Sequence, residues 1–384
     1  MSKKDTSLAP VLPSNMMIRL SPVAGLVMFA FLLIGLLCCL WAMFISGKVD
    51  LLPNKVSWDD IRNGEITHRI AKELANVPFA KRAADLERAA SWLVIGDTGS
   101  RVRQGCPGWL FLADELKVHP RAELNATARA QKVIALHEQL AVQGVELLVV
   151  LVPDKTRIAA DQRCAVVRSP LLDSRVQQWS AQLQAAGVMS LDLALQLQPL
   201  GNAAFLRTDS HWNEKGASAA AQAIAKKLGE LGVEASPVKH FNATLAAPAL
   251  RPGDLVRLAG LDWLPLTLQP QPETVSATQF QEVAQAASDS PVGEDDLFGD
   301  TQLPNVAVIG TSFSRNSSFI PFLENALNAR VGDFSLDGGE FSGAAKAYFQ
   351  SAAFQQTPPR IVVWEIPERD LQTPYVDDIH LPSR

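Results

Sequence analysis

An uncharged stretch from Val23 to Ile45 sets the strongest limit on how this chain can fold. An α-helix rises about 1.5 Å per residue, so a helix over this stretch reaches about 34 Å. That length crosses a hydrocarbon core of about 30 Å. The sequence therefore predicts a transmembrane anchor over residues 23–45, which separates the first residues from a large remaining part of the chain.

The charges before this stretch predict its orientation. Lys3, Lys4 and Arg19 precede it, against a single acid, Asp5. Such a basic excess favours a cytoplasmic tail over residues 1–22, with the rest of the chain in the periplasm. A long cleaved signal peptide is the alternative, but signal peptides usually have an apolar region of about 7–15 residues followed by small residues. We therefore expect an uncleaved, single-pass anchor in a bacterial inner membrane.

Composition narrows the classes of partner. The chain has 384 residues, 35 of them basic and 40 acidic, and a net charge of −5. A mildly acidic protein gives no reason to expect nucleic acid as a partner. With 47% hydrophobic residues it has enough apolar side chains for a sizeable core.

Cys106 and Cys164 are the only two cysteines after the anchor. An even number of cysteines in an oxidising compartment makes a disulfide between them plausible, and two unpaired buried thiols are the alternative. The chain has no C-x-x-C pair, so a zinc ribbon or a thioredoxin-like site has no support.

Strand-like and helix-like segments alternate along most of the exported chain. The run VELLVVLVP, Val145 to Pro153, is typical of a strand buried on both faces of a parallel sheet. NVAVIG and RIVVWEIP have the same character, and helical spacing lies between such runs. This alternation predicts an α/β three-layer sandwich around a mostly parallel sheet.

The remaining segments flank or interrupt this fold. Residues 46–94 are predicted to be a linker and a helical lead-in, and residues 95–371 to be the main domain. Within it, residues 237–304 hold eight of the 24 prolines and have no strong periodicity, which indicates a lid-like insertion of loops and short strands. Residues 372–384 form a C-terminal tail.

The sequence NVAVIGTSFS ends a predicted strand at Gly310-Thr311-Ser312, where a helix is expected to start. At such a turn the Ser312 hydroxyl would be exposed at the carboxyl edge of the sheet, where open parallel sheets bind ligands. Backbone N–H groups at a helix start lack intrahelical acceptors and can hold an oxyanion. Taken alone, the motif fits an N-capping serine at least as well.

The stretch RTDSHWNEKG adds the partners that a nucleophilic serine needs. Asp209 and His211 lie two residues apart in a predicted loop before a helix. A serine nucleophile requires a base, and the base requires an orienting acid. Asn213 is the better helix cap, which leaves Asp209 free, and Trp212 could line the pocket or simply pack. The joint pattern predicts a triad of Ser312, His211 and Asp209.

Other patterns are weaker. His380, beside Asp377 and Asp378, is the alternative base. The turn GDTGS at Gly96–Ser100 resembles a nucleophile turn, but it follows a short apolar patch, so we expect an ordinary loop. The chain has no metal-binding spacing such as H-E-x-x-H, no G-x-G-x-x-G and no Walker motif, so we expect neither a metal nor a nucleotide cofactor.

Five motifs resemble, in their order, the alginate O-acetyltransferase family of the AlgJ/AlgX type: GCPGWLFLADE, VVLVPDKTRIA, RTDSHWNEKGA, VIGTSFS and RIVVWEIPERDL. The resemblance spans roughly residues 95–371 and implies an SGNH-hydrolase-like fold with Asp209, His211 and Ser312 as its triad. Acid and histidine precede the serine, the reverse of the usual SGNH order. The N-terminal anchor is similar to that of AlgJ-type members, and no carbohydrate-binding module of the AlgX layout follows residue 371.

The resemblance implies a periplasmic O-acetyltransferase that modifies hydroxyls of an exopolysaccharide, such as alginate or cellulose, through an acetyl-serine. It implies as partners the polysaccharide acceptor, a membrane-bound O-acyltransferase that supplies acetyl groups, and other synthesis and export proteins, with no cofactor. The same triad would serve a carbohydrate acetylesterase, and a non-catalytic polysaccharide-binding scaffold is a further alternative.

The oxyanion donors of ordinary SGNH enzymes, a glycine and an asparagine, cannot be aligned with this chain. The candidates for oxyanion or substrate contacts are Gly310, Thr311, Asn316, Gly338, Gly339 and Trp212.

Overall fold

The computed structural model describes residues 21–44, 57–283, 303–374 and 379–381. The chain divides into two compact units, residues 1–87 and 88–384. The charged residues of the predicted cytoplasmic tail, part of the linker, residues 284–302 of the insertion, and Asp377 and Asp378 lie outside the described residues.

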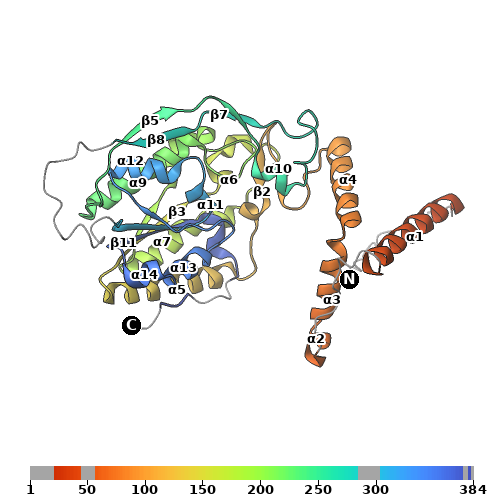
Figure 1. The fold of residues 1–384 in the computed structure, drawn as a ribbon, viewed down its shortest axis with the longest axis horizontal. Helices are drawn as coiled ribbons and strands as arrows, with labels where there is room; N and C mark the ends of the chain where they lie inside the picture. Colours follow the sequence, from red (N-terminus) through yellow and green to blue (C-terminus); the bar gives the residue numbers. More distant parts are fainter. Residues whose placement is uncertain (1–20, 45–56, 284–302, 375–378, 382–384) are drawn as a thin grey trace, which may run out of the picture. The chain divides into compact units, whose positions relative to one another are not determined.

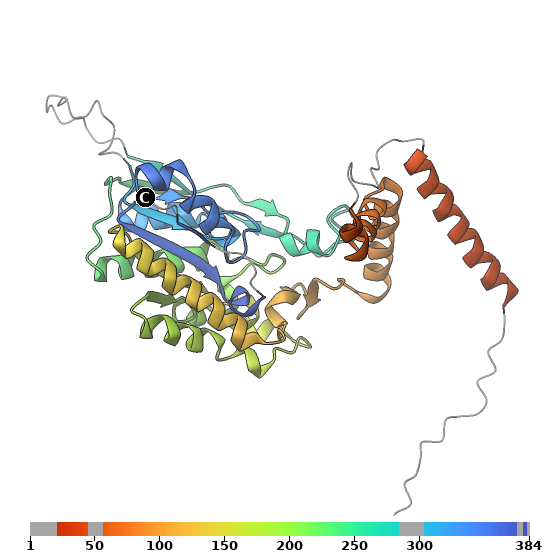
Figure 2. The same ribbon diagram turned by 90° about the horizontal axis from the view of Figure 1, so that it is seen from below.

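Helices make up the described part of the first unit (Figures 1 and 2). They are α1 (Pro22–Phe44), α2 (Trp58–Arg62), α3 (Glu65–Ala75) and the start of α4 (Pro78–Ile95). By length and composition, α1 could cross a membrane, as the sequence predicts, although a signal sequence would meet the same criteria.

The second unit is built on a five-stranded, all-parallel sheet. In spatial order its strands are β10 (Gly332–Asp333), β9 (Val306–Ile309), β11 (Ile361–Pro367), β3 (Glu146–Val152) and β4 (Met189–Asp192). Strands β9, β11 and almost all of β3 are fully buried, as their uninterrupted apolar sequences require. The edge strand β10 contains only Gly332 and Asp333.

Helices cover both faces of this sheet (Figure 1). One face carries α5 (Ala122–Val142), α7 (Arg175–Ala185), α13 (Gly343–Phe349) and α14 (Ala352–Gln356). The other carries α8 (Ala194–Leu197), α9 (Glu214–Glu230) and α12 (Phe319–Leu327). Successive residues of β3, such as Leu147 and Leu148, enter opposite cores. The predicted three-layer α/β sandwich is confirmed.

The described part of the insertion contains two pairs of short antiparallel strands, which form a ribbon together with the loops between them. Its paired strands are β5 (Phe241–Leu245) with β8 (Thr278–Glu282), and β6 (Ala249–Arg251) with β7 (Glu273–Val275). At the far end of the ribbon, α10 (Asp254–Leu258) packs in a small apolar core against the hairpin β1 (Val102–Gln104)–β2 (Leu110–Leu112). The end of the ribbon is therefore fixed to the domain.

The loop before α9 is held closely to its helix. As predicted, Asn213 caps α9, accepting hydrogen bonds from the backbone N–H groups of Lys215 and Gly216 at 3.0 and 3.1 Å. A Cβ on Gly216 would lie 2.2 Å from the Ala204 carbonyl oxygen, so only glycine allows this approach. The segment between Ala204 and Asn213, which contains Asp209 and His211, is thereby fixed at both ends.

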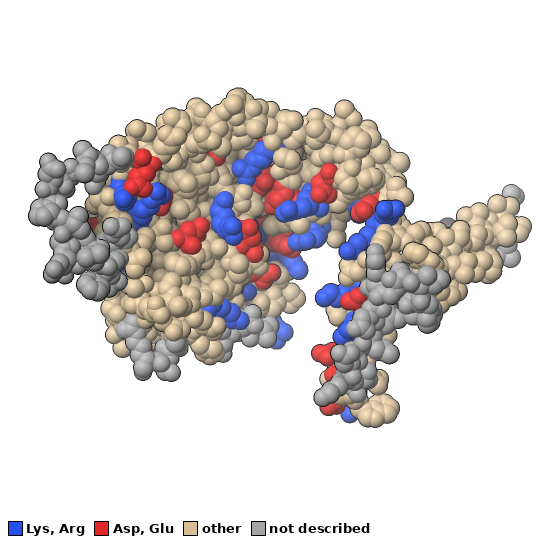
Figure 3. All heavy atoms as spheres, in the orientation of Figure 1, with Lys and Arg blue, Asp and Glu red and all other residues tan. Residues whose placement is uncertain are grey.

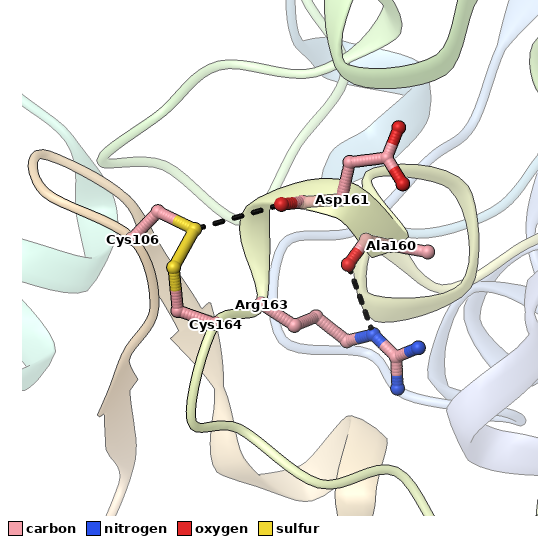
Figure 4. Close-up of a disulfide and its surroundings, with 5 residues drawn as sticks. All are labelled: Cys106, Ala160, Asp161, Arg163 and Cys164. Carbon is pink, nitrogen blue, oxygen red and sulfur yellow. Dashed lines mark hydrogen bonds between the residues drawn. A yellow bond between two sulfur atoms is a disulfide. The ribbon is translucent and has the colours of Figure 1, made fainter.

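A disulfide joins Cys106, in the β1–β2 turn, to Cys164 (Figure 4). The two Cα atoms lie 5.0 Å apart and the bond closes a separation of 58 residues. The Cys106 N–H also donates to the Gln162 carbonyl at 2.8 Å. The hairpin is therefore attached to the segment that follows β3 and α6 (Lys155–Ile158).

Replacing both cysteines by serine should lower the free energy of unfolding by about 4 kcal/mol, because the cross-link restricts a long loop in the unfolded chain. Urea unfolding of the full-length protein in detergent, with and without reductant, measures the change. The wild type in reductant should approach the double variant. Equal stability of all samples would show that the bond contributes nothing.

Candidate active site

Ser312 lies at the carboxyl edge of the sheet, where β9 ends and α11 (Ser312–Arg315) begins. Thr311, not Ser312, is the N-cap: its side chain accepts a hydrogen bond from the Phe313 N–H at 3.3 Å. The capping role considered for Ser312 is therefore wrong. As the first helical residue, Ser312 is half-buried, with its hydroxyl free for another partner.

The buried carboxylate of Glu365, on the central strand β11, holds this turn from below. It accepts hydrogen bonds from the Thr311 N–H at 2.7 Å and from the Ser314 hydroxyl at 3.1 Å. A Cβ on Gly310 would lie 2.5 Å from this carboxylate, so the close approach requires glycine. Burial raises the pKa of Glu365, although the bonds from Thr311 and Ser314 oppose the shift. Glu365 thus fixes the residues on both sides of Ser312.

His211 connects Ser312 to Asp209. Its Nε2 lies 2.7 Å from the Ser312 Oγ, and its Nδ1 lies 2.6 Å from the Asp209 Oδ1. The same carboxylate oxygen accepts the His211 backbone N–H at 3.0 Å, which explains how an acid only two residues away reaches the far side of the ring. The structure therefore brings the three predicted side chains into one hydrogen-bonded chain, although His211 and Ser312 are 101 residues apart in the sequence.

The charge on Asp209 determines the direction of these bonds. Burial opposes that charge, but hydrogen bonds from His211 and the nearby Arg251 outweigh it and hold the pKa of Asp209 below its usual range. An ionised Asp209 can only accept, so Nδ1 of His211 donates to it. Nε2 is then the acceptor for the Ser312 hydroxyl, which is the arrangement that a general base requires.

Lys155, directly after β3, anchors the loop that carries Asp209. Its fully buried ammonium donates to three carbonyl oxygens, those of Leu110 at 2.7 Å and of Arg207 and Asp209 at 2.9 Å. It also lies 5.1 Å from the ring centroid of Trp109. Burial lowers the pKa of Lys155 to about 8. One side chain thus joins the sheet, the β1–β2 hairpin and the acid–base loop.

Asp254, at the start of α10, supports the same loop from the insertion. It accepts hydrogen bonds from the Ser210 N–H at 2.7 Å and hydroxyl at 2.6 Å, and lies 3.7 Å from the His211 Nδ1. Its own N–H points to the Asp209 Oδ2 at 3.3 Å. Burial and the charge on Asp209 raise the pKa of Asp254. No local sequence pattern pointed to Asp254, because the insertion has no periodicity.

Asp209, His211 and Asp254 place three potential ligand atoms within 4.8 Å of one another. Both ring nitrogens of His211 already have partners in Asp209 and Ser312. We therefore interpret these side chains as a hydrogen-bond network and assign them no metal.

The predicted oxyanion and substrate candidates separate into two groups. Asn316 is occupied: its amide donates to the Ser312 carbonyl at 2.7 Å and accepts from Arg251 at 2.7 Å. The N–H groups of Thr311 and Gly339 donate to Glu365 and Leu336, and Gly310 is a packing position. Within the described ranges, the N–H groups of Ser312 and Gly338 have no protein acceptor, so these two are the candidates for oxyanion donors.

Trp212 does not line the site. Its ring is fully buried and packs against Phe313 and Phe319, with centroids 5.0 and 4.9 Å away. Phe313 in turn lies edge-on to the His211 imidazole at 5.0 Å. Trp212 therefore packs in the core behind the base, which is the second of the two roles that the sequence allowed. His380 is exposed and belongs to no triad with Ser312.

Two hollows meet at Ser312, of about 530 and 430 Å³. They share only His211, Asp254, Ser312 and Gly338. We call them the Arg257 hollow, which extends over the insertion, and the His119 hollow, which extends towards the β1–β2 hairpin and the end of β11. Each has a volume typical of a small-molecule site, so the serine is accessible from two sides.

Known proteins match most of this unit. The model of the family described as "SGNH hydrolase-like domain, acetyltransferase AlgX" matches residues 102–368. The chain is 30% identical over 319 residues to the probable alginate O-acetylase AlgJ of Pseudomonas aeruginosa, covering 80% of each protein. Identity to the Azotobacter vinelandii protein of the same description is 29%, over 82% of this chain and 81% of that protein.

A solved structure has the same fold. The O-acetyltransferase domain of Pseudomonas putida AlgJ superposes with a TM-score of 0.61 at 29% identity, covering 71% of this chain and 92% of that domain.

Lys155→Met should reduce both stability and turnover, because it leaves buried carbonyl groups without a donor and releases the Asp209 loop. We expect unfolding free energy to fall by about 2–4 kcal/mol and kcat for a small acetyl ester to fall more than its KM rises. Urea unfolding and ester kinetics measure the two effects. Lys226→Met, on the exposed face of α9, is the control and should change neither.

Asp209→Asn should change the dependence of stability on pH. The folded protein lowers the pKa of Asp209, so this group stabilises the fold above the unfolded value of about 4 and loses its effect as pH falls through the folded value. The difference in unfolding free energy between wild type and variant should therefore shrink below about pH 4. A constant difference would contradict the assigned charge, and Asp161→Asn on the surface is the matched control.

Proposed function

Because this chain belongs to the SGNH hydrolase-like acetyltransferase family of AlgX, and is therefore an acyltransferase, we propose that it transfers acetyl groups to hydroxyls of an exopolysaccharide in the periplasm. Family membership and fold confirm the resemblance drawn from the five motifs. The observation that carries the proposal is the hydrogen-bonded chain Asp209–His211–Ser312, with 2.6 and 2.7 Å contacts at the carboxyl edge of the sheet.

The first half of the reaction loads the enzyme. As the Ser312 Oγ attacks the carbonyl carbon of an acetyl ester, its proton moves to the His211 Nε2, and Asp209 stabilises the imidazolium. In this proposal the N–H groups of Ser312 and Gly338 stabilise the oxyanion of the tetrahedral intermediate. Its collapse breaks the bond to the leaving alcohol, which takes the proton from His211, and acetyl-Ser312 remains.

The second half reverses these steps with a sugar. The glycan hydroxyl gives its proton to the His211 Nε2 and its oxygen attacks the acetyl carbon. Collapse of the second tetrahedral intermediate breaks the ester to Ser312, and Ser312 recovers the proton from His211. The acetylated glycan leaves and the resting triad is restored.

The predicted membrane anchor determines where the proposed reaction takes place. With α1 as an inner-membrane anchor and residues 1–22 in the cytoplasm, the second unit lies on the periplasmic side. Acetyl-CoA is cytoplasmic, so the acetyl group would come through a membrane-bound O-acyltransferase partner. The relatives' names place them in alginate O-acetylation, and an assembly with further polysaccharide synthesis and export proteins is part of this proposal.

Ser312→Ala should lower ester turnover by the full contribution of the triad, about 10⁴-fold or more, with unchanged stability. The assay uses the full-length chain in detergent, a p-nitrophenyl acetate donor and a mixture of oligosaccharides, with acetylated sugars counted by mass spectrometry. The control is Ser100→Ala, in the exposed GDTGS loop.

The outcomes separate the candidate functions. Wild type should form acetylated sugars and be labelled at Ser312 by a sulfonyl fluoride. Acetate release without acetylated sugar indicates an esterase. Full activity of Ser312→Ala, or absence of label on the wild type, would leave only the scaffold role.

A further inference from the structure

The walls of the two hollows around Ser312 carry more acidic than basic side chains. Besides Asp209 of the triad, six acids line them: Asp114, Asp254, Asp262, Asp337, Glu340 and Asp370. Five basic residues oppose these acids: Arg101, Lys117, Arg251, Arg257 and Arg369. Counted by residue type, the seven acids outnumber the five basic residues, so these walls hold no surplus of positive charge.

Two of the five basic residues already interact with other groups of the protein. The guanidinium of Arg251 donates to the Asn316 Oδ1 at 2.7 Å and lies 4.0 Å from the Asp209 Oδ2. Burial opposes the charge on Arg369, but Asp370 and Glu115 outweigh it and raise its pKa, so its charge is compensated internally. Neither guanidinium is free to neutralise an incoming anion.

The remaining three basic residues are matched in number by three exposed acids. Arg101, Lys117 and Arg257 form no ion pair with any described carboxylate, but Asp114, Asp262 and Glu340 are likewise exposed and unpaired within the described residues. Asp337 lies near Arg315, at 3.8 Å from its Nε. On the face drawn in Figure 3, basic and acidic side chains alternate in small groups, without a broad basic tract among the coloured residues.

This charge distribution limits the acceptor. A polyuronate carries one carboxylate on every sugar at neutral pH, and a surplus of positive charge along its path favours the binding of such a polymer. Like charges brought together at a binding site are costly and lower the rate of encounter. A neutral glycan meets neither penalty, and its hydroxyls are suited to hydrogen bonds with alternating acids and bases.

We infer that the acceptor is a neutral, hydroxyl-rich glycan and not a polyuronate, an inference that rests on the transferase function proposed above. The specificity would then be set by the charged walls of the hollows, while the triad performs the same chemistry on any hydroxyl. The chain would in this respect differ from relatives named for alginate.

The test compares two acceptors of equal length, a neutral β-linked glucan oligosaccharide and an oligomannuronate, with the full-length chain in detergent. Acetyl-Ser312 formation is first measured without acceptor, so that loading is known to be intact. We expect kcat/KM for transfer to the neutral acceptor to exceed that for the oligomannuronate by about tenfold or more. An equal or higher value for the oligomannuronate overturns the inference and leaves transfer intact.

The dependence of KM on ionic strength is an independent test of the inference. Raising NaCl from about 0.05 M to about 0.5 M screens repulsion, so KM for the oligomannuronate should fall while KM for the neutral acceptor stays constant. A KM for the oligomannuronate that rises with salt would reveal an attractive site and contradict the inference. If acetyl-Ser312 forms but neither sugar is acetylated, transfer itself fails, and the inference fails with it.

Charge reversal tests the hollows directly. Asp262→Lys changes the Arg257 hollow and Asp114→Lys the His119 hollow. At least one should improve kcat/KM for the oligomannuronate by up to about fivefold, the range for an exposed ion pair, with loading unchanged. Glu138→Lys adds the same charge near the end of α5, which leads to the opposite edge of the sheet, and should have no effect. No gain in either hollow variant would count against the inference.

Discussion

The buried ammonium of Lys155 is the interaction on which the geometry of the site depends. A charged group without water is tolerated only when its hydrogen bonds are satisfied, and here three carbonyl oxygens satisfy it. These oxygens belong to the β1–β2 hairpin and to the loop that carries Asp209. The Cys106–Cys164 disulfide attaches that hairpin to the segment that follows Lys155. The disulfide and the hydrogen bonds of Lys155 therefore hold the same hairpin in place.

The sequence was sufficient to predict the sheet and the convergence of the three polar side chains, for different reasons. Apolar runs such as Val145–Pro153 cannot be solvated, so they had to become buried strands, and the carboxyl edge of a parallel sheet then collects Asp209, His211 and Ser312. Glu365, within such a run, had no role assigned from the sequence, and only the structure shows its buried carboxylate bonded to the loop that carries Ser312.

Other features depended on tertiary contacts that no local pattern contains. Asp254 reaches His211 because a ribbon of paired strands carries it across the domain, and its own segment has no periodicity. Threonine and serine both cap helices, so only the extended backbone of Thr311 identifies it as the cap instead of its neighbour. The sequence allowed the Trp212 ring to pack inward or outward. It packs inward, against Phe313 and Phe319.

The parts of the site come from remote positions along the chain: His211 and Ser312 are 101 residues apart, and Asp254 lies 44 residues from Ser210. Contacts between residues so far apart carry a loop-closure entropy cost, which the packing of the folded domain must offset. A partly folded chain therefore lacks the contacts that would activate Ser312. We expect reactivity towards esters only in the completely folded domain.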